Sequence, residues 1–157
     1  MQHQTVLTGI DYLSVLDAKR ITARISKDHG IPPDRAERIL NGTMGFLQLS
    51  AHNPGHSFTP SADIDKGWHT LLLYTRTYRE LCYKLGNKFI DHEPSDGKIR
   101  VQRGGSANTV KFMLENQIPF DQELWPGDMA NDCQADPCNC TGDGYAPQPV
   151  TQVFATA

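Results

Sequence analysis

The sequence predicts an all-α fold, a compact bundle of about four helices in residues 1–127, followed by an irregular, cysteine-bearing tail in residues 128–157. Two observations predict this division. Apolar residues recur every three or four positions in four segments, the spacing that gives a helix one buried face. From Met129 onward, Asn, Asp, Gly, Pro, Gln and Thr dominate, and such a composition buries too little apolar surface to form a core. A chain of 157 residues is long enough for one domain with a substantial core.

The first two predicted helices cover residues 12–29 and 34–52. Apolar residues in the first lie about one turn apart, at Leu13, Leu16, Ile21 and Ile25. Gly30 is a natural stop, and the prolines of "IPPD" break the chain before Pro33 or Asp34 opens the second helix. The stretch "NPGHSFTP" predicts a loop after it.

Residues 61–86, "SADIDKGWHTLLLYTRTYRELCYKLG", predict a single long helix. Ser61 is a suitable N-cap, Asp65 lies near the positive N-terminal end, and Gly86 marks the C-terminal end. One face collects the residues expected to face the core: Ile64, Trp68, Leu71, Leu72, Thr75 and Cys82. Cys82 is therefore expected to be a buried, nearly apolar residue.

The remaining segments are shorter. Residues 98–102, "KIRVQ", predict a short extended pair, and residues 106–118 predict a fourth helix that Ser106 caps. The stretch "PFDQELWPGD" predicts a final turn held in place by Trp125.

Charge and hydropathy exclude several functions. The formal net charge is −3 and the basic residues are scattered, which argues against a nucleic-acid partner. No apolar stretch approaches the ~20 residues that cross a bilayer, and the start "MQHQTVLTGIDYL" lacks the parts of a signal peptide. We therefore expect a cytoplasmic protein with reduced thiols that binds neither nucleic acid nor membrane.

Asp65 and His69 form the first candidate for chemistry. They are four residues apart, so both side chains lie on one side of the predicted helix and can meet at the flank of its buried face. A carboxylate that orients an imidazole in this way supports a metal-ligating histidine, and it also suits a general base. The alternative is a histidine hydrogen-bonded to Asp65 for stability alone.

His92 is a possible second histidine ligand. If the helix ran unbroken to Gly86, the chain would have to return about 25 Å along it, and six extended residues reach about 20–22 Å. The two imidazoles could then close the site only if "NKFIDH" were nearly fully extended. In the same unbroken helix Cys82 lies roughly 20 Å from His69, which excludes it from a shared ion unless the helix breaks.

His52 and His56 flank the loop just before the long helix and give a second possible ligand set with Asp65 and His69. Taken singly, each is more often a solvated loop histidine. Three nitrogen and oxygen ligands with an open position suit zinc or another divalent metal.

The tail holds three crowded cysteines, Cys133, Cys138 and Cys140, in "CQADPCNC". This spacing is not the paired C-x2-C of structural zinc sites, although three thiolates suit a soft ion such as Cu(I) or Zn(II). The alternatives are a disulfide between Cys133 and one of the other two, or unligated thiols.

Residues 60–94 resemble the glycine-rich domain-containing protein-like family. The shared pattern is a helix with D-x-x-W-H, then Y, C and G, and finally I-x-H beside an acidic residue or proline. Here it falls on Asp65, Trp68, His69, Tyr78, Cys82, Gly86, Ile90 and His92. Plant members often carry a further histidine where this chain has Leu71, and the glycine-rich region is missing here. The resemblance implies a helical domain with a shared site around Asp65, His69 and His92, and it implies no particular reaction.

Three hypotheses follow. The first is a divalent-metal site, zinc or another ion, at Asp65, His69 and His92, with the tail thiols as a second, softer site that could hold copper. The second is a metal-free interaction module that binds a protein partner through the tail or through loop 52–60. The third is a hydrolase-like enzyme with His69 as the general base.

Overall fold

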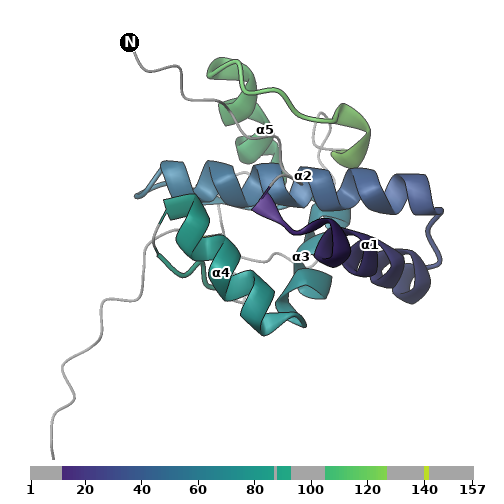
Figure 1. Ribbon diagram of the computed structural model, residues 1–157. Coiled ribbons are helices and arrows are strands. Elements are labelled where there is room, and N and C mark those ends of the chain that lie inside the picture. The colour runs from purple at the N-terminus through teal and green to yellow at the C-terminus, as the bar shows by residue number, and fades with distance from the viewer. Residues whose placement is uncertain (1–11, 87, 93–104, 127–139, 142–157) are drawn as a thin grey trace, which may run out of the picture.

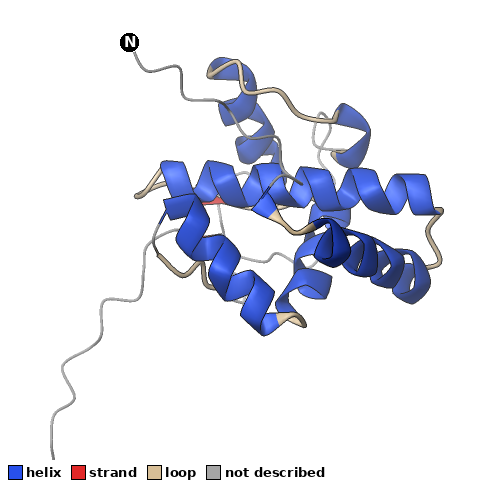
Figure 2. Cartoon of the chain, viewed as in Figure 1, coloured by secondary structure: helices blue, strands red, loops and turns tan. Residues whose placement is uncertain are grey.

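The computed structural model describes residues 12–86, 88–92, 105–126 and 140–141. Nearly all the regular structure in this part of the chain is helical, which confirms the all-α prediction (Figure 2). The helices are α1 (Val15–His29), α2 (Pro33–His52), α3 (Ala62–Leu72), α4 (Thr75–Gly86) and α5 (Gly105–Glu115), with a 3-10 turn, η2, at Gln122–Leu124. In the described residues no helix is both long and apolar enough to cross a membrane.

The ends of α1 and α2 follow from local sequence. Ser14 caps α1 by accepting a hydrogen bond from the Asp17 amide at 3.0 Å. Gly30 ends α1 in the left-handed region at φ 63°, as predicted, and donates its N–H to the Ser26 carbonyl. Pro33 opens α2, where its missing N–H costs no hydrogen bond.

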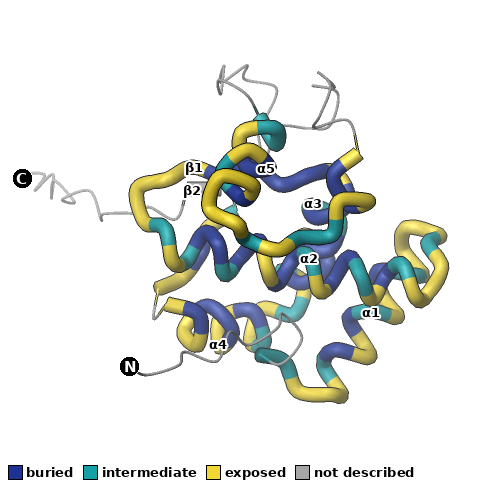
Figure 3. The backbone as a smooth tube through the Cα atoms, turned by 90° about the horizontal axis from the view of Figure 1, so that it is seen from above, coloured by how far each residue is buried: buried dark blue, intermediate teal, exposed yellow. Residues whose placement is uncertain are grey.

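Helix α2 is the centre of the fold. It packs against α1, α3 and α4 on one side, and α5 and η2 lie on its other side (Figure 1). Buried positions gather where α2 and α3 meet, while α1 and α4 alternate buried and exposed residues (Figure 3). The largest fully buried side chains form this core: Trp68, Tyr78, Phe46, Ile21, Ile25, Ile39, Leu40, Met44, Leu47, Ile64, Leu71 and Leu81.

The prediction of one continuous helix over residues 61–86 is wrong. The chain breaks at Leu73 and Tyr74, and α4 leaves the end of α3 at an angle (Figure 1). Both residues donate their N–H groups to carbonyls three positions back, at 3.2 and 3.0 Å, which tightens and ends α3.

A tertiary hydrogen bond explains why the break is kept. The indole nitrogen of Trp68 donates to the hydroxyl of Tyr78 at 3.0 Å. In an unbroken helix these residues would be about 15 Å apart along the axis, and their side chains would lean in the same direction. The buried pair could not form there. The segment contains no glycine or proline at 73–74, so local sequence gives no sign of the break.

Helices α2 and α3 cross closely at Gly67 and Gly42. A Cβ on Gly67 would lie 2.1 Å from Oγ1 of Thr43, and one on Gly42 would lie 2.7 Å from Cδ1 of Ile64. The Thr43 hydroxyl lies 2.8 Å from the Ile39 carbonyl in its own helix and 3.2 Å from the Ile64 carbonyl of α3. The glycines therefore set the distance between α2 and the helix that carries Asp65 and His69.

The C-terminal elements are anchored to α2 and α3. The Arg38 guanidinium binds both carboxylate oxygens of Asp121 at 2.8 and 2.9 Å, and the Ser61 hydroxyl donates to the Leu124 carbonyl at 2.5 Å. Trp125 is buried against Phe46, which confirms the predicted turn held by this tryptophan.

The predicted loop at "NPGHSFTP" needs a correction. It contains the two-residue strand β1 (Ser57–Phe58), which pairs antiparallel with β2 (Cys140–Thr141) from the tail. The sequence does not predict so short a strand, because it forms only by pairing with residues 82 to 84 positions away. Two predictions lie outside the described residues: the extended pair at 98–102 and the cysteines Cys133 and Cys138. For Cys140 the structure describes the backbone only.

Candidate metal centre

Two histidines contact one carboxylate on the outer side of α3. Nδ1 of His69 lies 3.1 Å from Oδ2 of Asp65, and Nε2 of His92 lies 3.2 Å from Oδ1. The imidazole rings are 4.4 Å apart between centroids. One ligand atom from each of the three residues lies within 4.8 Å of the other two, which makes this a group that could hold a metal ion.

Asp65 and His69 are positioned by α3. Ser61 caps this helix by accepting from the Ile64 amide, and its carbonyl accepts from the Asp65 amide at 2.9 Å. Asp65 therefore lies near the positive end of the helix, which favours an anionic carboxylate. The predicted meeting of Asp65 and His69 across one helical turn is confirmed.

His92 arrives from the segment that follows α4. The sequence suggested that residues 87–92 would have to be nearly fully extended to bring His92 back to His69. Because the helix breaks at 73–74, the chain has a shorter distance to cover. The side chain of His92 is only 5% exposed, and its ring meets the Trp68 ring edge-to-face at 4.7 Å between centroids. The imidazole is thus held by packing on one side and by the carboxylate on the other.

The three side chains differ in their access to solvent. His69 is 51% exposed, Asp65 is 18% exposed, and His92 is almost covered. The site is therefore open on the His69 side and closed on the His92 side. Water or a small molecule can approach the group from the open side without moving the core.

The donor set fits a divalent ion. Zinc bound at about 2.0–2.2 Å places neighbouring ligand atoms roughly 3.3–3.5 Å apart in a tetrahedral site, and an octahedral ion places them about 3 Å apart. The two histidine–carboxylate separations, 3.1 Å to Oδ2 and 3.2 Å to Oδ1 of Asp65, are of this size, although each histidine faces a different oxygen. The ligand atoms of the group lie within 4.8 Å of one another, and the exposed His69 has space to adjust its ring.

Without metal, the same atoms make hydrogen bonds. A ring nitrogen that carries a hydrogen can donate it to the facing oxygen of Asp65. A metal ion at this point would be held through the facing nitrogen of each neutral imidazole, whose hydrogen would then lie on the other ring nitrogen. The group can therefore act as a ligand set, or as an imidazole oriented by a carboxylate.

The neighbouring carboxylate of Asp63 is committed elsewhere. Arg35 donates to it at 2.7 Å and Lys66 at 2.9 Å. Burial raises the pKa of Asp63, but the hydrogen bonds and charges of Lys66 and Arg35 outweigh burial and hold the pKa below its usual value. Asp63 is therefore a structural anion that ties α3 to α2.

Among the described residues, neither His52 nor His56 is part of the metal-ligand group. Nε2 of His52 lies 3.2 Å from the Leu85 carbonyl at the end of α4, and the exposed His56 stacks on Phe58. The second predicted ligand set, which used these histidines, is not assembled. Cys82 remains buried although the helix breaks; burial raises the pKa of its thiol, and hydrogen bonds with the Ile90 backbone and Tyr78 partly offset the rise. Cys82 is therefore a core residue, as predicted.

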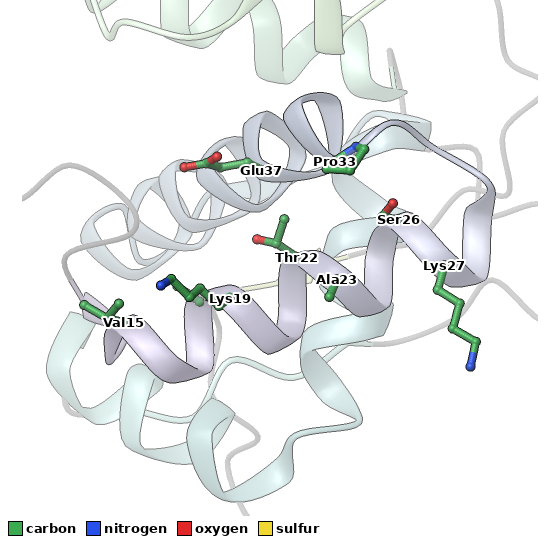
Figure 4. Close-up of a pocket in the computed structure, with 9 residues that line it drawn as sticks. Val15, Lys19, Thr22, Ala23, Ser26, Lys27, Pro33 and Glu37 are labelled. Atoms are coloured by element: carbon green, nitrogen blue, oxygen red, sulfur yellow. The ribbon is translucent and has the colours of Figure 1, made fainter.

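A groove between α1 and α2 lies apart from the metal-ligand group and shares no residue with it (Figure 4). Its lining combines Val15 and Ala23 with the cations Lys19 and Lys27, and its carboxylate is that of Glu37. One carboxylate beside two lysines does not make a metal site, so the groove adds no second centre.

The sequence singles out Tyr78 only as part of the family pattern, yet the residue contacts the backbone that precedes His92. Its hydroxyl accepts from Trp68 and donates to the Ile90 carbonyl at 2.5 Å. No family model matches the chain, and neither a curated protein nor a solved structure is significantly similar to it, so the resemblance of residues 60–94 stays a prediction.

Proposed function

We propose that Asp65, His69 and His92 bind a divalent metal ion and that zinc is the first candidate. The observation that supports this most is the convergence of two imidazoles, from separate segments, on the two oxygens of one carboxylate. The stability of α3 does not require such a group: a surface pair such as Asp65–His69 contributes at most about 1 kcal/mol, and His92 is not part of the helix.

The ligand types narrow the choice of ion. Two imidazoles and a carboxylate favour Zn²⁺, Cu²⁺, Ni²⁺ or Fe²⁺ over Mg²⁺ and Ca²⁺, which prefer oxygen ligands. Catalytic zinc sites commonly use three protein ligands and leave one position to water, whose pKa the ion lowers to about 7. The open side at His69 provides space for that water.

A second candidate function is metal-free general-base chemistry at His69. Its exposed imidazole and its contact with Asp65 favour this role, because the carboxylate fixes which ring nitrogen carries the hydrogen. The two proposals differ in metal content, so one experiment separates them. The tail thiols, as a softer copper or zinc site, stay a prediction that the same experiment includes.

The test is elemental analysis of tag-free protein, followed by zinc titration of the chelator-treated protein. The ligand variants are Asp65→Asn, His69→Gln and His92→Gln. His56→Gln is the matched control, since it removes an imidazole that lies outside the group. A variant with all three tail cysteines replaced by serine tests the tail.

We expect about one zinc per chain in the wild type, in the His56 control and in the tail variant, as a single three-ligand site requires. Each ligand variant should lose the ion or bind it far more weakly. Ion retained in all three ligand variants would contradict the proposal. Ion lost only in the tail variant would move the site to the thiols, and a metal-free wild type would leave general-base chemistry or a protein partner as the function to test.

A further inference from the structure

We propose that Tyr78 is a positioning residue of this centre, and that its hydroxyl sets metal affinity by holding the backbone that presents His92. The proposal rests on the proposed metal-binding function. The Tyr78 hydroxyl contacts Trp68 and Ile90, which are not ligands, and acts on the site through them. Tyr78 is 1% exposed and lies on α4, so it reaches the site only because the chain breaks before that helix.

The hydroxyl of Tyr78 joins two parts of the site. It accepts the indole N–H of Trp68 at 3.0 Å and donates to the carbonyl of Ile90 at 2.5 Å. Trp68 belongs to α3, next to His69, and Ile90 lies two residues before His92. The hydroxyl therefore fixes the distance between the helix that carries two ligands and the segment that carries the third.

The segment of His92 depends on such contacts. Residues 89–92 form neither helix nor strand, so no backbone ladder holds them. The Ile90 side chain is buried, Phe89 meets the Tyr78 ring edge-to-face at 5.4 Å, and the Cys82 thiol hydrogen-bonds with the Ile90 backbone. Tyr78 contacts Phe89 and Ile90, which precede His92 in the chain. It also contacts Trp68, whose ring packs against the His92 imidazole.

Removing the hydroxyl in Tyr78→Phe leaves the Trp68 N–H and the Ile90 carbonyl without this partner. His92 then samples positions farther from Asp65 and His69. Residues that orient a metal ligand typically change metal affinity by about 10–100-fold when they are replaced, and we expect a loss in this range.

Thr109→Val is a matched control for the loss of a buried hydroxyl. The Thr109 hydroxyl is also 1% exposed, accepts the Thr59 amide at 2.9 Å and donates to the Thr59 carbonyl at 2.8 Å. It joins α5 to the residue that follows β1, and neither Thr59 nor Thr109 belongs to the metal-ligand group. Both variants should lose similar stability, so a difference in metal affinity reports position rather than folding.

The experiment measures zinc affinity by chelator competition in the wild type, Tyr78→Phe and Thr109→Val. It also records the Co²⁺ absorption spectrum at saturation and the His92 ring resonances of metal-free protein. We expect an affinity loss of about 10–100-fold with an altered Co²⁺ spectrum in Tyr78→Phe only. Should Tyr78→Phe not fold, Trp68→Phe removes the N–H that the hydroxyl accepts, together with part of the ring that meets His92, and should act in the same direction.

Wild-type affinity in Tyr78→Phe, or equal losses in the two variants, would overturn the role of Tyr78 and leave the metal site standing. A wild type that binds no zinc would instead overturn the proposed function. In that case the metal-free His92 resonances decide the positioning role: a change in Tyr78→Phe but not in Thr109→Val supports it, and no change refutes it.

Discussion

Replacing Gly67 by alanine tests the close crossing of α2 and α3 on which the site depends. A Cβ on Gly67 lies 2.1 Å from Oγ1 of Thr43 and 3.0 Å from Cγ2 of Ile39, while ordinary contacts begin at 3.4 Å. Rotating the threonine away would give up its hydrogen bonds to the carbonyls of Ile39 and Ile64. The helices must therefore separate, or the buried hydroxyl must lose its partners.

The cost can be worked from these contacts. Overpacking a core costs about 1–3 kcal/mol, and losing the threonine's hydrogen bonds costs about 1 kcal/mol more. Alanine is better than glycine inside a helix by about 1 kcal/mol, which offsets part of the cost. We expect Gly67→Ala to lower the free energy of unfolding by about 2 kcal/mol, which corresponds to a melting temperature lower by about 6–8 °C.

Urea unfolding followed by circular dichroism measures this change. Gly45→Ala is the control, because it lies in α2 and its added Cβ meets nothing within 4 Å; this variant should be neutral or slightly more stable. Adding Thr43→Ala to Gly67→Ala removes the worst contact and should make the double change less than additive. If Gly67→Ala were as benign as Gly45→Ala, the reasoning from the close crossing would be refuted.

Three further outcomes are expected. The folded-state pKa values of Asp63 and Asp121 are lowered, so both carboxylates stabilise the protein above about pH 4 and lose that contribution as the pH falls below it. Urea unfolding from pH 7 to pH 3 should show this loss of stability, and replacing both residues by asparagine should make the stability depend less on pH. With the other cysteines replaced by serine, the buried Cys82 thiol should react with a thiol reagent only at the rate of unfolding, and fast reaction in native buffer would contradict its burial. Ser61→Ala removes both the cap of α3 and the bond to the Leu124 carbonyl, so thermal unfolding should show a loss of about 1–2 kcal/mol, and an unchanged melting temperature would exclude that dual role.

Local chemistry predicted most of the fold. The stop at Gly30, the start of α2 at Pro33 and the cap at Ser61 are each decided by one residue whose backbone preference or side-chain oxygen acts within a few positions. The break at 73–74 could not be predicted in this way, because a hydrogen bond between Trp68 and Tyr78 maintains it. The pairing of β1 with the tail is likewise a contact between distant segments.

The candidate site was predictable to a similar extent. The contact of Asp65 with His69 follows from helical spacing. The sequence allows the contact with His92 but does not require it, and the estimate of its reach assumes an unbroken helix, which the structure does not have. His52 and His56 lie close to α3 in sequence but turn to Leu85 and Phe58 instead. Sequence separation gave no means of choosing among the three histidines, because the direction of each side chain depends on tertiary packing.

The break between α3 and α4 also has a consequence for the order in which the protein folds. The contact of Asp65 with His92 closes a loop of 27 residues, whereas the contact of Arg38 with Asp121 spans 83. Loop-closure entropy makes the shorter loop less costly by about 1 kcal/mol. The ligand group therefore depends on α3 and α4 and on α2, against which both pack, whereas η2 closes the longer loop and can dock later.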